Sequence, residues 1–208
     1  MFLDRKDAGR KLAEALLHYK RQPAVVYALP RGGVAVAAEV AEALELPLDL
    51  IIVRKIGHPQ SREYAIGAVT EDGDLVSNPQ ETLQLDPDWI ASAAAEQMAE
   101  AQRRRSLYLK DRNPIDVRDK TAIIVDDGLA TGYTMEAAMS QLRKRHPRKI
   151  VVAVPVAAPD TANRIRDEVD ELVVIDVPRG WFGAIGAYYR NFDQVRDEEV
   201  VALMDAFG

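Results

Sequence analysis

Short, continuous runs of apolar residues are the feature that most constrains how this chain can fold. Such runs are typical of strands buried on both faces, as parallel strands are when helices cover both sides of a sheet. Amphipathic stretches with a helical period separate most of the runs, which gives repeated strand–helix–strand units. The sequence therefore predicts an α/β fold with a doubly wound, mainly parallel sheet. The predicted strands are 24–29, 48–53, 121–125, 150–156 and 171–177, and the predicted helices are 5–19, 34–44, 135–145 and 161–169.

One region departs from this alternation. Residues 65–70 and 75–77 lie on either side of a glycine-containing turn, which predicts a β-hairpin. Residues 57–63 before the hairpin predict a flexible loop, and residues 87–109 predict an alanine-rich helix with one apolar side. The tail from residue 178 gathers aromatic residues and ends in a helix predicted over 197–206. We expect one domain over residues 1–208, with small hood elements at 78–118 and 178–208.

The composition excludes several classes of site. The chain has no cysteine, which rules out disulfides and thiolate metal ligands, and its three histidines are scattered without metal-ligand spacing. The formal net charge of −6 offers no general attraction to polyanions, so no nucleic-acid partner is expected. No apolar run approaches the roughly 20 residues of a membrane span, and the first residues do not resemble a signal peptide. We expect a cytoplasmic protein with no membrane partner, and self-association into a homo-oligomer stays open.

The loop after the predicted strand 121–125 carries the richest chemistry. Two adjacent carboxylates are followed by two glycines and two threonines that lead directly into a helix. Backbone N–H groups and hydroxyls at the start of a helix can hold a phosphate, whereas the two acids need hydroxyl donors or a cation as partners. A pentose phosphate supplies both hydroxyls and phosphate. The segment predicted to cradle it consists of Asp126, Asp127, Gly128, Leu129, Ala130, Thr131, Gly132, Tyr133 and Thr134.

An apolar strand, two acids and a loop of the form Thr-Gly-x-Thr resemble the signature of type I phosphoribosyltransferases. The resemblance implies that Asp126 and Asp127 contact ribose hydroxyls and that residues 128–134 wrap the 5-phosphate of phosphoribosyl pyrophosphate. Acid pairs also follow strands in Walker B segments and in receiver domains. The chain has no Gly-x-x-x-x-Gly-Lys-Ser/Thr motif, however, and receivers place their acids after the first strand. The order of motifs along nearly the full chain resembles predicted bacterial phosphoribosyltransferases whose acceptor is not established.

Two further loops carry cations. After the first predicted strand, Arg31 is followed by Gly32 and Gly33, which let backbone amides approach an anion closely and resemble the family's pyrophosphate loop. A tight connection between a strand and a helix explains the same residues. Arg54 and Lys55 end the second predicted strand, and the resemblance implies that they offset charge on departing pyrophosphate while the next loop closes over the reacting centre. An exposed basic turn is the alternative.

The reaction implied by the resemblance is displacement of pyrophosphate from the sugar by a nitrogen nucleophile. Mg²⁺ bridges the pyrophosphate and the sugar hydroxyls and needs few protein ligands, with Asp126 and Asp127 as the candidates. The expected partners are therefore small molecules, namely phosphoribosyl pyrophosphate and a nitrogen acceptor such as a nucleobase. The alternative function is a non-catalytic sensor of phosphoribosyl pyrophosphate or of a nucleotide on the same fold.

The acceptor is the part of the site that the sequence constrains least. Hypoxanthine-guanine members of the family place an acid where this chain has Ala130, which disfavours a 6-oxopurine acceptor. Trp181, Phe182 and Tyr188 are candidates for stacking on a flat base. The same three residues can instead form a small aromatic core that pins the tail.

Overall fold

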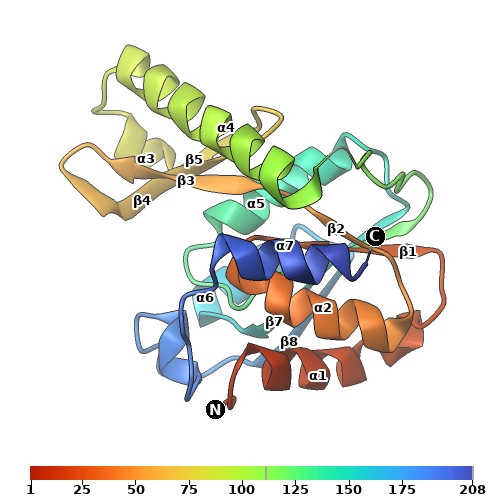
Figure 1. The fold of residues 1–208 in the computed structure, drawn as a ribbon. Coiled ribbons are helices and arrows are strands. Elements are labelled where there is room, and N and C mark those ends of the chain that lie inside the picture. The colour runs from red at the N-terminus through yellow and green to blue at the C-terminus, as the bar shows by residue number, and fades with distance from the viewer. Residues whose placement is uncertain (111, 208) are drawn as a thin grey trace.

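The computed structural model describes residues 1–110 and 112–207, with residues 62 and 63 described by their backbone alone. A parallel sheet with the strand order β2-β1-β6-β7-β8 forms its centre (Figure 1). This confirms the predicted mainly parallel sheet. Its strands are β1 (Ala24–Ala28), β2 (Leu48–Leu50), β6 (Thr121–Val125), β7 (Lys149–Val156) and β8 (Glu171–Asp176).

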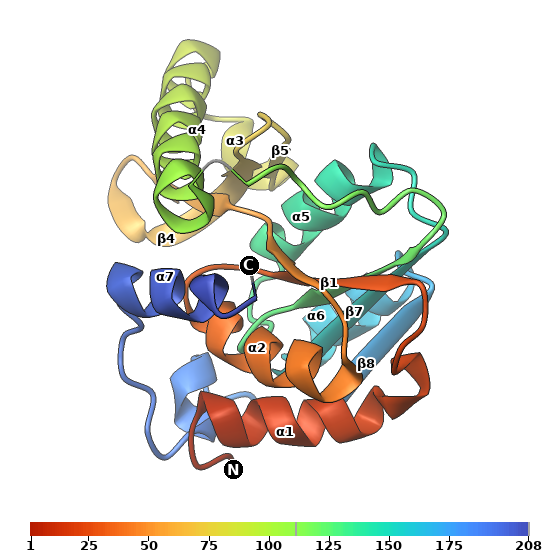
Figure 2. The same ribbon diagram turned by 45° about the vertical axis from the view of Figure 1, so that its right-hand side comes forward.

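Helices cover both faces of this sheet, as a doubly wound fold requires (Figure 2). Side chains of β6 alternate between the two layers, since Ile123 packs into the core on one face and Ile124 into the core on the other. Both are fully buried, which explains why the strand is a continuous apolar run. The helices are α1 (Arg5–Ala15) and α2 (Gly32–Leu44) on one face, and α5 (Tyr133–Arg143) and α6 (Pro159–Arg166) on the other.

A second, antiparallel sheet of three strands packs against α5, which thus contacts both sheets. The long helix α4 (Pro87–Leu109) covers the other side of the small sheet (Figure 1). The small sheet consists of β3 (Val53–His58), β4 (Ser61–Thr70) and β5 (Leu75–Ser77), followed by α3 (Pro79–Thr82). Residue 111 of the expected hood 78–118 and residue 208 at the end of the chain lie outside the described residues.

The hairpin is larger than the sequence predicted. Residues 57–63, expected as a loop, instead belong largely to β3 and β4. The pairing shifts register between Ile56 and Gly57 and again between Gly57 and His58. Such irregularities interrupt the alternation of apolar and polar residues that marks a strand, so the pattern was lost there. The glycine turn between β4 and β5 is confirmed, with Gly73 at a φ of 88°.

The tail from residue 178 packs back along the start of the chain. Phe2 pairs with Tyr189, and both belong to a separate apolar cluster. After the 3₁₀ turn η2 (Ile185–Tyr188), the chain reaches α7 (Asp197–Asp205), which packs between α2 and α4 (Figure 1). None of the helices in the described part of the chain has the length and apolar character needed to cross a membrane.

Candidate active site

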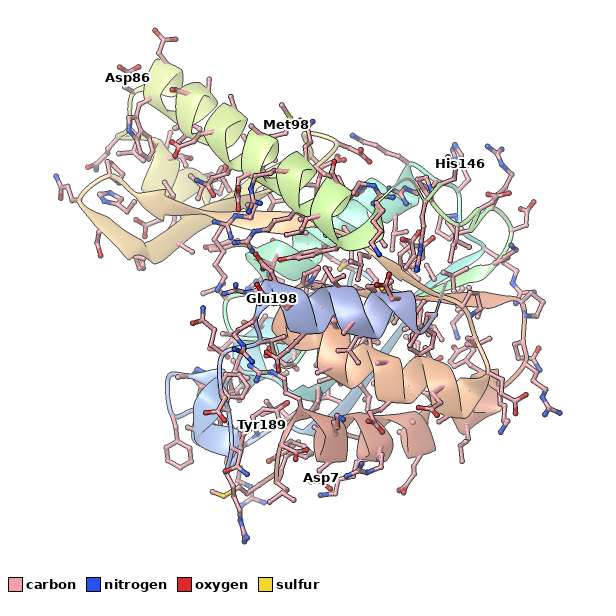
Figure 3. All side chains as sticks on the ribbon, viewed as in Figure 1. Asp7, Asp86, Met98, His146, Tyr189 and Glu198 are labelled. Carbon is pink, nitrogen blue, oxygen red and sulfur yellow. The ribbon has the colours of Figure 1, made fainter. Side chains whose placement is uncertain are left out.

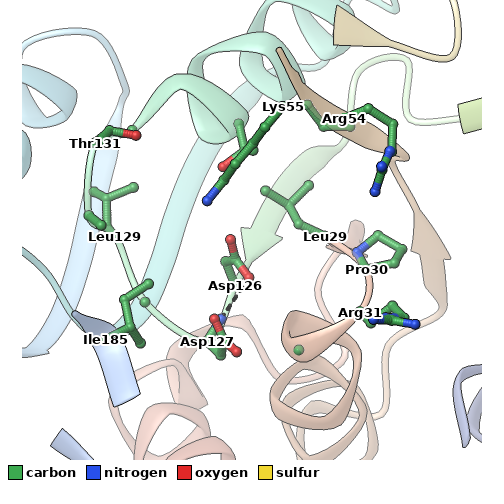
Figure 4. Close-up of a pocket in the computed structure, with 16 residues that line it drawn as sticks. Leu29, Pro30, Arg31, Arg54, Lys55, Asp126, Asp127, Leu129, Thr131 and Ile185 are labelled. Atoms are coloured by element: carbon green, nitrogen blue, oxygen red, sulfur yellow. Dashed lines mark hydrogen bonds between the residues drawn. The ribbon is translucent and has the colours of Figure 1, made fainter. Parts of the chain in front are cut away.

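From β1 the chain first adds β2 at one edge of the large sheet, and it later adds β6 on the other side of β1. The direction in which strands are added therefore reverses between the neighbours β1 and β6. At such a switch point the loops after the two strands diverge and leave a crevice. The crevice contains a cavity of about 390 Å³, lined by residues 29–32, 53–55 and 126–132 together with Thr134 and Ile185 (Figure 4). Two of the three predicted loops therefore meet in one cavity with the start of β3, where the sequence predicted the third loop.

Asp126 and Asp127 lie side by side in the wall of this cavity (Figure 4). Oδ1 of Asp126 accepts a hydrogen bond from the backbone N–H of Asp127 at 2.8 Å. Burial, together with the neighbouring Asp127 carboxylate, raises the pKa of Asp126 well above its ordinary value. Burial also raises the pKa of Asp127, although Arg5 acts in the opposite direction. Two adjacent carboxylates with little access to water favour a ligand that donates hydrogen bonds or carries positive charge.

Residues from both ends of the chain hold Asp127. Its Oδ2 accepts a hydrogen bond from Nε of Arg5 at 2.8 Å, and its backbone carbonyl accepts one from the hydroxyl of Tyr189 at 2.6 Å. Burial and the nearby Asp127 raise the pKa of Tyr189, so that hydroxyl keeps its proton and remains a donor. Tyr189 lies on the tail beside the start of α1 (Figure 3).

The two glycines after β1 let the opposite loop come very close to the acids. A Cβ atom at Gly32 would overlap the carboxylate of Asp127, and one at Gly33 would lie 3.0 Å from the Cα of Asp126. Gly32 lines the cavity, whereas Gly33 is buried behind it against the acid loop. The sequence predicted that these glycines permit close approach, and within the protein they approach the acid pair.

Arg31 stands at the start of α2, on the far side of the cavity from the loop that precedes α5 (Figure 4). Its Nη1 donates a hydrogen bond to Oδ1 of Asp197 at 3.3 Å, and the hydroxyl of Tyr108 donates to the same oxygen at 2.5 Å. The Pro30–Arg31 peptide bond is cis. The first residue of α7 and the last turns of α4 thus orient the guanidinium of this loop.

The loop that precedes α5 is held in place by α6. Gly132 has a φ of 89°, a left-handed conformation that strains residues with a Cβ atom. The hydroxyl of Thr161 donates to the carbonyl of Ala130 at 2.6 Å, and Nη2 of Arg164 donates to the carbonyl of Thr131 at 2.5 Å. Two loop carbonyls are therefore bonded to α6, while the first N–H groups of α5 lack helical acceptors, as at any helix start, and can meet an anion.

Not every residue of the predicted cradle faces the cavity. Leu129, Ala130, Thr131 and Thr134 line it. The side chain of Tyr133 instead packs against the apolar cluster between α5 and the large sheet. The bulky residue at this position therefore leaves the cavity side of the loop to glycine and threonine.

The two cations at the start of β3 face the same cavity. Lys55 reaches into it toward Asp126 (Figure 4). Arg54 is half-buried, and its Nε donates a hydrogen bond to the side chain of Gln97 on α4 at 3.2 Å. Burial and the nearby Arg104 lower the pKa of Arg54. The cavity thus has acids on one wall and cations on the facing wall.

The three aromatic residues that were predicted to contact the acceptor differ in their burial and in their contacts. Tyr188 is buried in the tail's apolar cluster and stacks on Trp181, with ring centroids 5.2 Å apart. Its hydroxyl is hydrogen-bonded to backbone atoms of residues 180 and 182. The side chain of Phe182 is exposed, with 75% of the residue accessible. Among the described residues, the tail lines the cavity through Ile185, which packs over Gly128.

Residues 3–193 match the family model described as the phosphoribosyl transferase domain. The matched span includes every loop that lines the cavity. The chain belongs to the phosphoribosyl transferase family. The resemblance drawn from the acid pair and the Thr-Gly-x-Thr loop is confirmed.

Two related proteins share the whole span of this phosphoribosyl transferase domain. A protein from Mycobacterium tuberculosis (strain H37Rv), provisionally named a phosphoribosyl transferase, is 44% identical over 207 residues, which are 99% of this chain and 46% of that protein. The chain thus spans about half the length of the curated relatives that it matches. The crystal structure of TT1426 from Thermus thermophilus is 42% identical, with a TM-score of 0.83 over 100% of this chain and 99% of that one.

A more distant structure shares the fold. The purine phosphoribosyltransferase from Pyrococcus horikoshii is 22% identical, with a TM-score of 0.51 over 87% of this chain and 89% of that one. At this level of identity the likeness concerns the fold of the domain.

The site fits Mg²⁺ of the kind that arrives with a phosphorylated substrate. Within residues 1–110 and 112–207, side chains of His, Cys, Asp and Glu form no group of three or more that could hold a metal ion. Asp126 and Asp127 nevertheless put two carboxylates in a cavity beside a loop suited to phosphate. Mg²⁺ keeps several waters and needs one or two carboxylates when phosphates supply the other ligands.

The sequence did not predict Ile185, which lines the cavity, or the residues that hold the site from a distance: Arg5, Tyr108, Tyr189 and Asp197. One signal for Arg5 was present. A cation in the first turn of a helix is disfavoured by the helix dipole, so Arg5 needed an acidic partner elsewhere. The sequence contains no comparable signal for Tyr189, because it is one of several aromatic residues in the tail.

Proposed function

We propose that this phosphoribosyl transferase domain binds phosphoribosyl pyrophosphate and transfers its phosphoribosyl group to a nitrogen acceptor, with release of pyrophosphate. The observation that carries the proposal is the charge separation in the cavity. Asp126, Asp127 and the loop before α5 form one wall, and Arg31, Arg54 and Lys55 face them. A donor with a phosphate at one end, hydroxyls in the middle and a pyrophosphate at the other end matches this order of groups.

The loop before α5 binds the 5-phosphate in this proposal. The N–H groups at the start of α5 and the hydroxyls of Thr131 and Thr134 are its donors. Asp126 and Asp127 accept hydrogen bonds from the ribose hydroxyls, which is the kind of donor that two buried carboxylates need.

The pyrophosphate lies against the loop after β1, within reach of the cations on β3. Arg31 binds it through its guanidinium, and Gly32 and Gly33 leave the backbone accessible. Arg54 and Lys55 offset the negative charge that develops on the leaving group.

In the reaction, the bond from the anomeric carbon to pyrophosphate breaks as the bond to the acceptor nitrogen forms. Positive charge develops on the ribose ring, and the carboxylates of Asp126 and Asp127 stabilise it. Mg²⁺ supplies positive charge on the pyrophosphate when it is bound with the donor. Holding the donor at both ends positions the anomeric carbon for attack, so no nucleophilic side chain is required.

We assign residues 1–208 to one functional unit with a hood built from residues 78–118 and 178–208. The acceptor attacks from the side opposite the departing pyrophosphate, which directs it to the wall formed by Ile185 of the tail. Phe182 and Trp181 are the candidates for contact with a flat acceptor from this segment, because Tyr188 is already committed to the local core. Ala130 offers no carboxylate to a 6-oxopurine.

The direct test measures pyrophosphate release from phosphoribosyl pyrophosphate and Mg²⁺ in the presence of purines, pyrimidines and other nitrogen acceptors. We expect turnover with at least one acceptor and none with the Asp126→Asn/Asp127→Asn variant. Absence of donor binding to the unaltered protein by calorimetry would overturn the proposal.

Binding without turnover across the whole panel would favour the non-catalytic sensor. A sensor that acts on nucleic acid should then show salt-sensitive binding in a gel-shift assay. The formal net charge of −6 does not favour such a partner.

A further inference from the structure

Each of the two carboxylates in the cavity has one oxygen already engaged by the protein. Oδ1 of Asp126 accepts the backbone N–H of Asp127, and Oδ2 of Asp127 accepts Nε of Arg5. Among the described residues, no donor reaches the other oxygen of either carboxylate. This leaves one free acceptor on each acid, which matches two neighbouring hydroxyls.

Arg5 is well placed to decide which oxygen of Asp127 stays free. Its side chain is 12% exposed and that of Asp127 is 13% exposed, so the ion pair is largely shielded from water. The guanidinium is itself fixed in three ways. Besides the bond to Asp127, its Nη1 donates to the carbonyl of Asp193 at 2.7 Å, and its Cζ lies 3.8 Å from the centre of the Phe192 ring.

Gly32 reinforces the same orientation from the opposite side. A Cβ atom at Gly32 would overlap Oδ2 of Asp127 and come within 3.0 Å of Nε of Arg5. The paired oxygen therefore lies between Gly32 of α2 and the side chain of Arg5. Rotation of the carboxylate away from this arrangement would leave Arg5 without its charged partner in a shielded environment, which is unfavourable.

We infer that Arg5 is a positioning residue that holds Oδ2 of Asp127 and thereby presents Oδ1 to a ribose hydroxyl. The inference rests on the proposed function, because it assumes that the acid pair binds the sugar. Arg5 does not touch the substrate in this arrangement. It makes the first helix and the tail part of the sugar site, through Asp127 on one side and Asp193 and Phe192 on the other.

Calorimetry with ribose 5-phosphate and its 2-deoxy and 3-deoxy analogues tests this role without metal or acceptor. We expect the unaltered protein to prefer ribose 5-phosphate to at least one analogue. Arg5→Gln should weaken ribose 5-phosphate binding by about tenfold or more, the worth of a hydrogen bond to a charged group, and should change binding of that deoxy analogue much less. Arg5→Lys keeps the positive charge but loses the planar guanidinium with its several N–H donors, and should recover part of the preference for ribose 5-phosphate.

The outcomes separate positioning from a merely structural cross-link. Arg10→Gln is the matched control, because Arg10 lies on the same helix and pairs with Glu39 of α2 at 3.8 Å, away from the cavity; it should leave the preference unchanged. An equal loss for ribose 5-phosphate and both analogues in the Arg5 variants, or an unchanged preference, would overturn the inference. If Arg5→Gln fails to fold, the preference of Arg5→Lys decides alone. Failure of the unaltered protein to bind ribose 5-phosphate would instead count against the proposed function.

Discussion

The acid wall of the cavity, formed by residues 126–134, and the basic wall, formed by Arg54 and Lys55, differ in how the fold holds them. The acid wall follows a central strand of the large sheet and is bonded to α1, α6 and the tail. The basic wall stands on the small sheet. Arg54 is tied to Gln97, and within the described part of the chain Lys55 has no ion-pair partner.

This difference corresponds to the two tasks that we propose. A carboxylate that meets a sugar hydroxyl must be placed within about 0.5 Å, so it benefits from partners on every side. A cation on a long side chain acts at longer range and can follow a leaving group as it moves. The acid wall is thus formed before the donor arrives, whereas the basic wall can adjust to it.

The largest expected effect comes from removing the acid wall's charges. The Asp126→Asn/Asp127→Asn variant should bind phosphoribosyl pyrophosphate with Mg²⁺ at least about 100-fold more weakly, because two hydrogen bonds to charged acceptors are lost. Calorimetry measures this loss. Glu198→Gln, an exposed acid on α7, is the control for a change of charge alone (Figure 3). An affinity within a factor of two of the unaltered protein would remove the acid wall from the donor site.

The two single variants, Asp126→Asn and Asp127→Asn, should differ in thermal stability, which tests how the fold holds each carboxylate. Burial penalises the charge of Asp126, so Asp126→Asn should not lower the melting temperature. Asp127→Asn should lower it, because Arg5 loses its partner in a shielded environment. Thermal unfolding at pH 8 checks the order.

The basic wall should give a smaller effect. Lys55→Met should weaken binding of magnesium pyrophosphate by about tenfold, since one charge that faces the cavity is removed from a site that keeps Arg31 and Arg54. Calorimetry with pyrophosphate measures this without any acceptor. Lys6→Met, on an exposed position of α1, should have no effect. A loss as large as that of the acid pair would contradict the distinction between a preformed and an adjustable wall.

Contacts of the β4–β5 turn connect the small sheet to the rest of the fold. Glu71 is buried there, with Arg105 of α4 donating to its Oε1 at 2.7 Å and Gln141 of α5 beside it. The pKa of Glu71 is raised to about 7, mainly by burial and also by the neighbouring Asp72, while Arg105 and Arg145 act in the opposite direction. The small sheet that carries Arg54 and Lys55 is therefore connected to the rest of the fold through a carboxyl group with a pKa near neutral pH.

The buried Glu71 in this turn predicts a pH dependence of stability. Between about pH 4.5 and 7 the folded state binds more protons at Glu71 than the unfolded chain does, so the free energy of unfolding falls as pH rises through this window. The contribution is on the order of 3 kcal/mol. Urea unfolding across the window should show a shallower decline for Glu71→Gln. Glu42→Gln, exposed on α2, should retain the slope of the unaltered protein. Identical slopes in all three proteins would show that Glu71 does not titrate in this range.

The same two walls show how far the sequence predicts the structure. The run 121–125 is apolar because its strand is covered on both faces, and that pattern located β6 and the loop after it without any tertiary information. The hairpin under the basic wall was predicted in part, since the register shifts beside Gly57 break the period that identifies a strand. Regular burial is thus visible in a sequence, and irregular pairing is not.

A similar distinction applies to the site: the lining residues form local sequence patterns, whereas their partners come from distant parts of the chain. Apart from Ile185, the residues that line the cavity come from three short segments, and each segment shows its chemistry locally as acids, glycines or cations. The pairs Arg5–Asp127 and Arg31–Asp197 join segments far apart in the chain, and only the topology brings them together. Their positions depend on how the chain ends fold back over the sheet, which no local pattern specifies.

The smallest expected effect tests the tail, which completes the cavity beside the acid wall. Phe182→Ala should change the free energy of unfolding by less than about 0.5 kcal/mol, because the side chain is exposed. Tyr188→Phe should cost about 1 kcal/mol, since the lost hydroxyl is bonded to two backbone groups of the same segment. Urea unfolding compares the two variants, and neither should alter donor affinity.

The two aromatic residues then separate the two possible uses of the tail. If Phe182 stacks on the acceptor, Phe182→Ala raises the KM for the acceptor by several-fold, the worth of one aromatic contact, while stability stays constant. Tyr188→Phe keeps its ring in the cluster with Trp181 and leaves that KM unchanged. An unchanged acceptor KM in both variants would assign the aromatic tail wholly to local packing, and Ile185 would remain as the tail's contribution to the cavity.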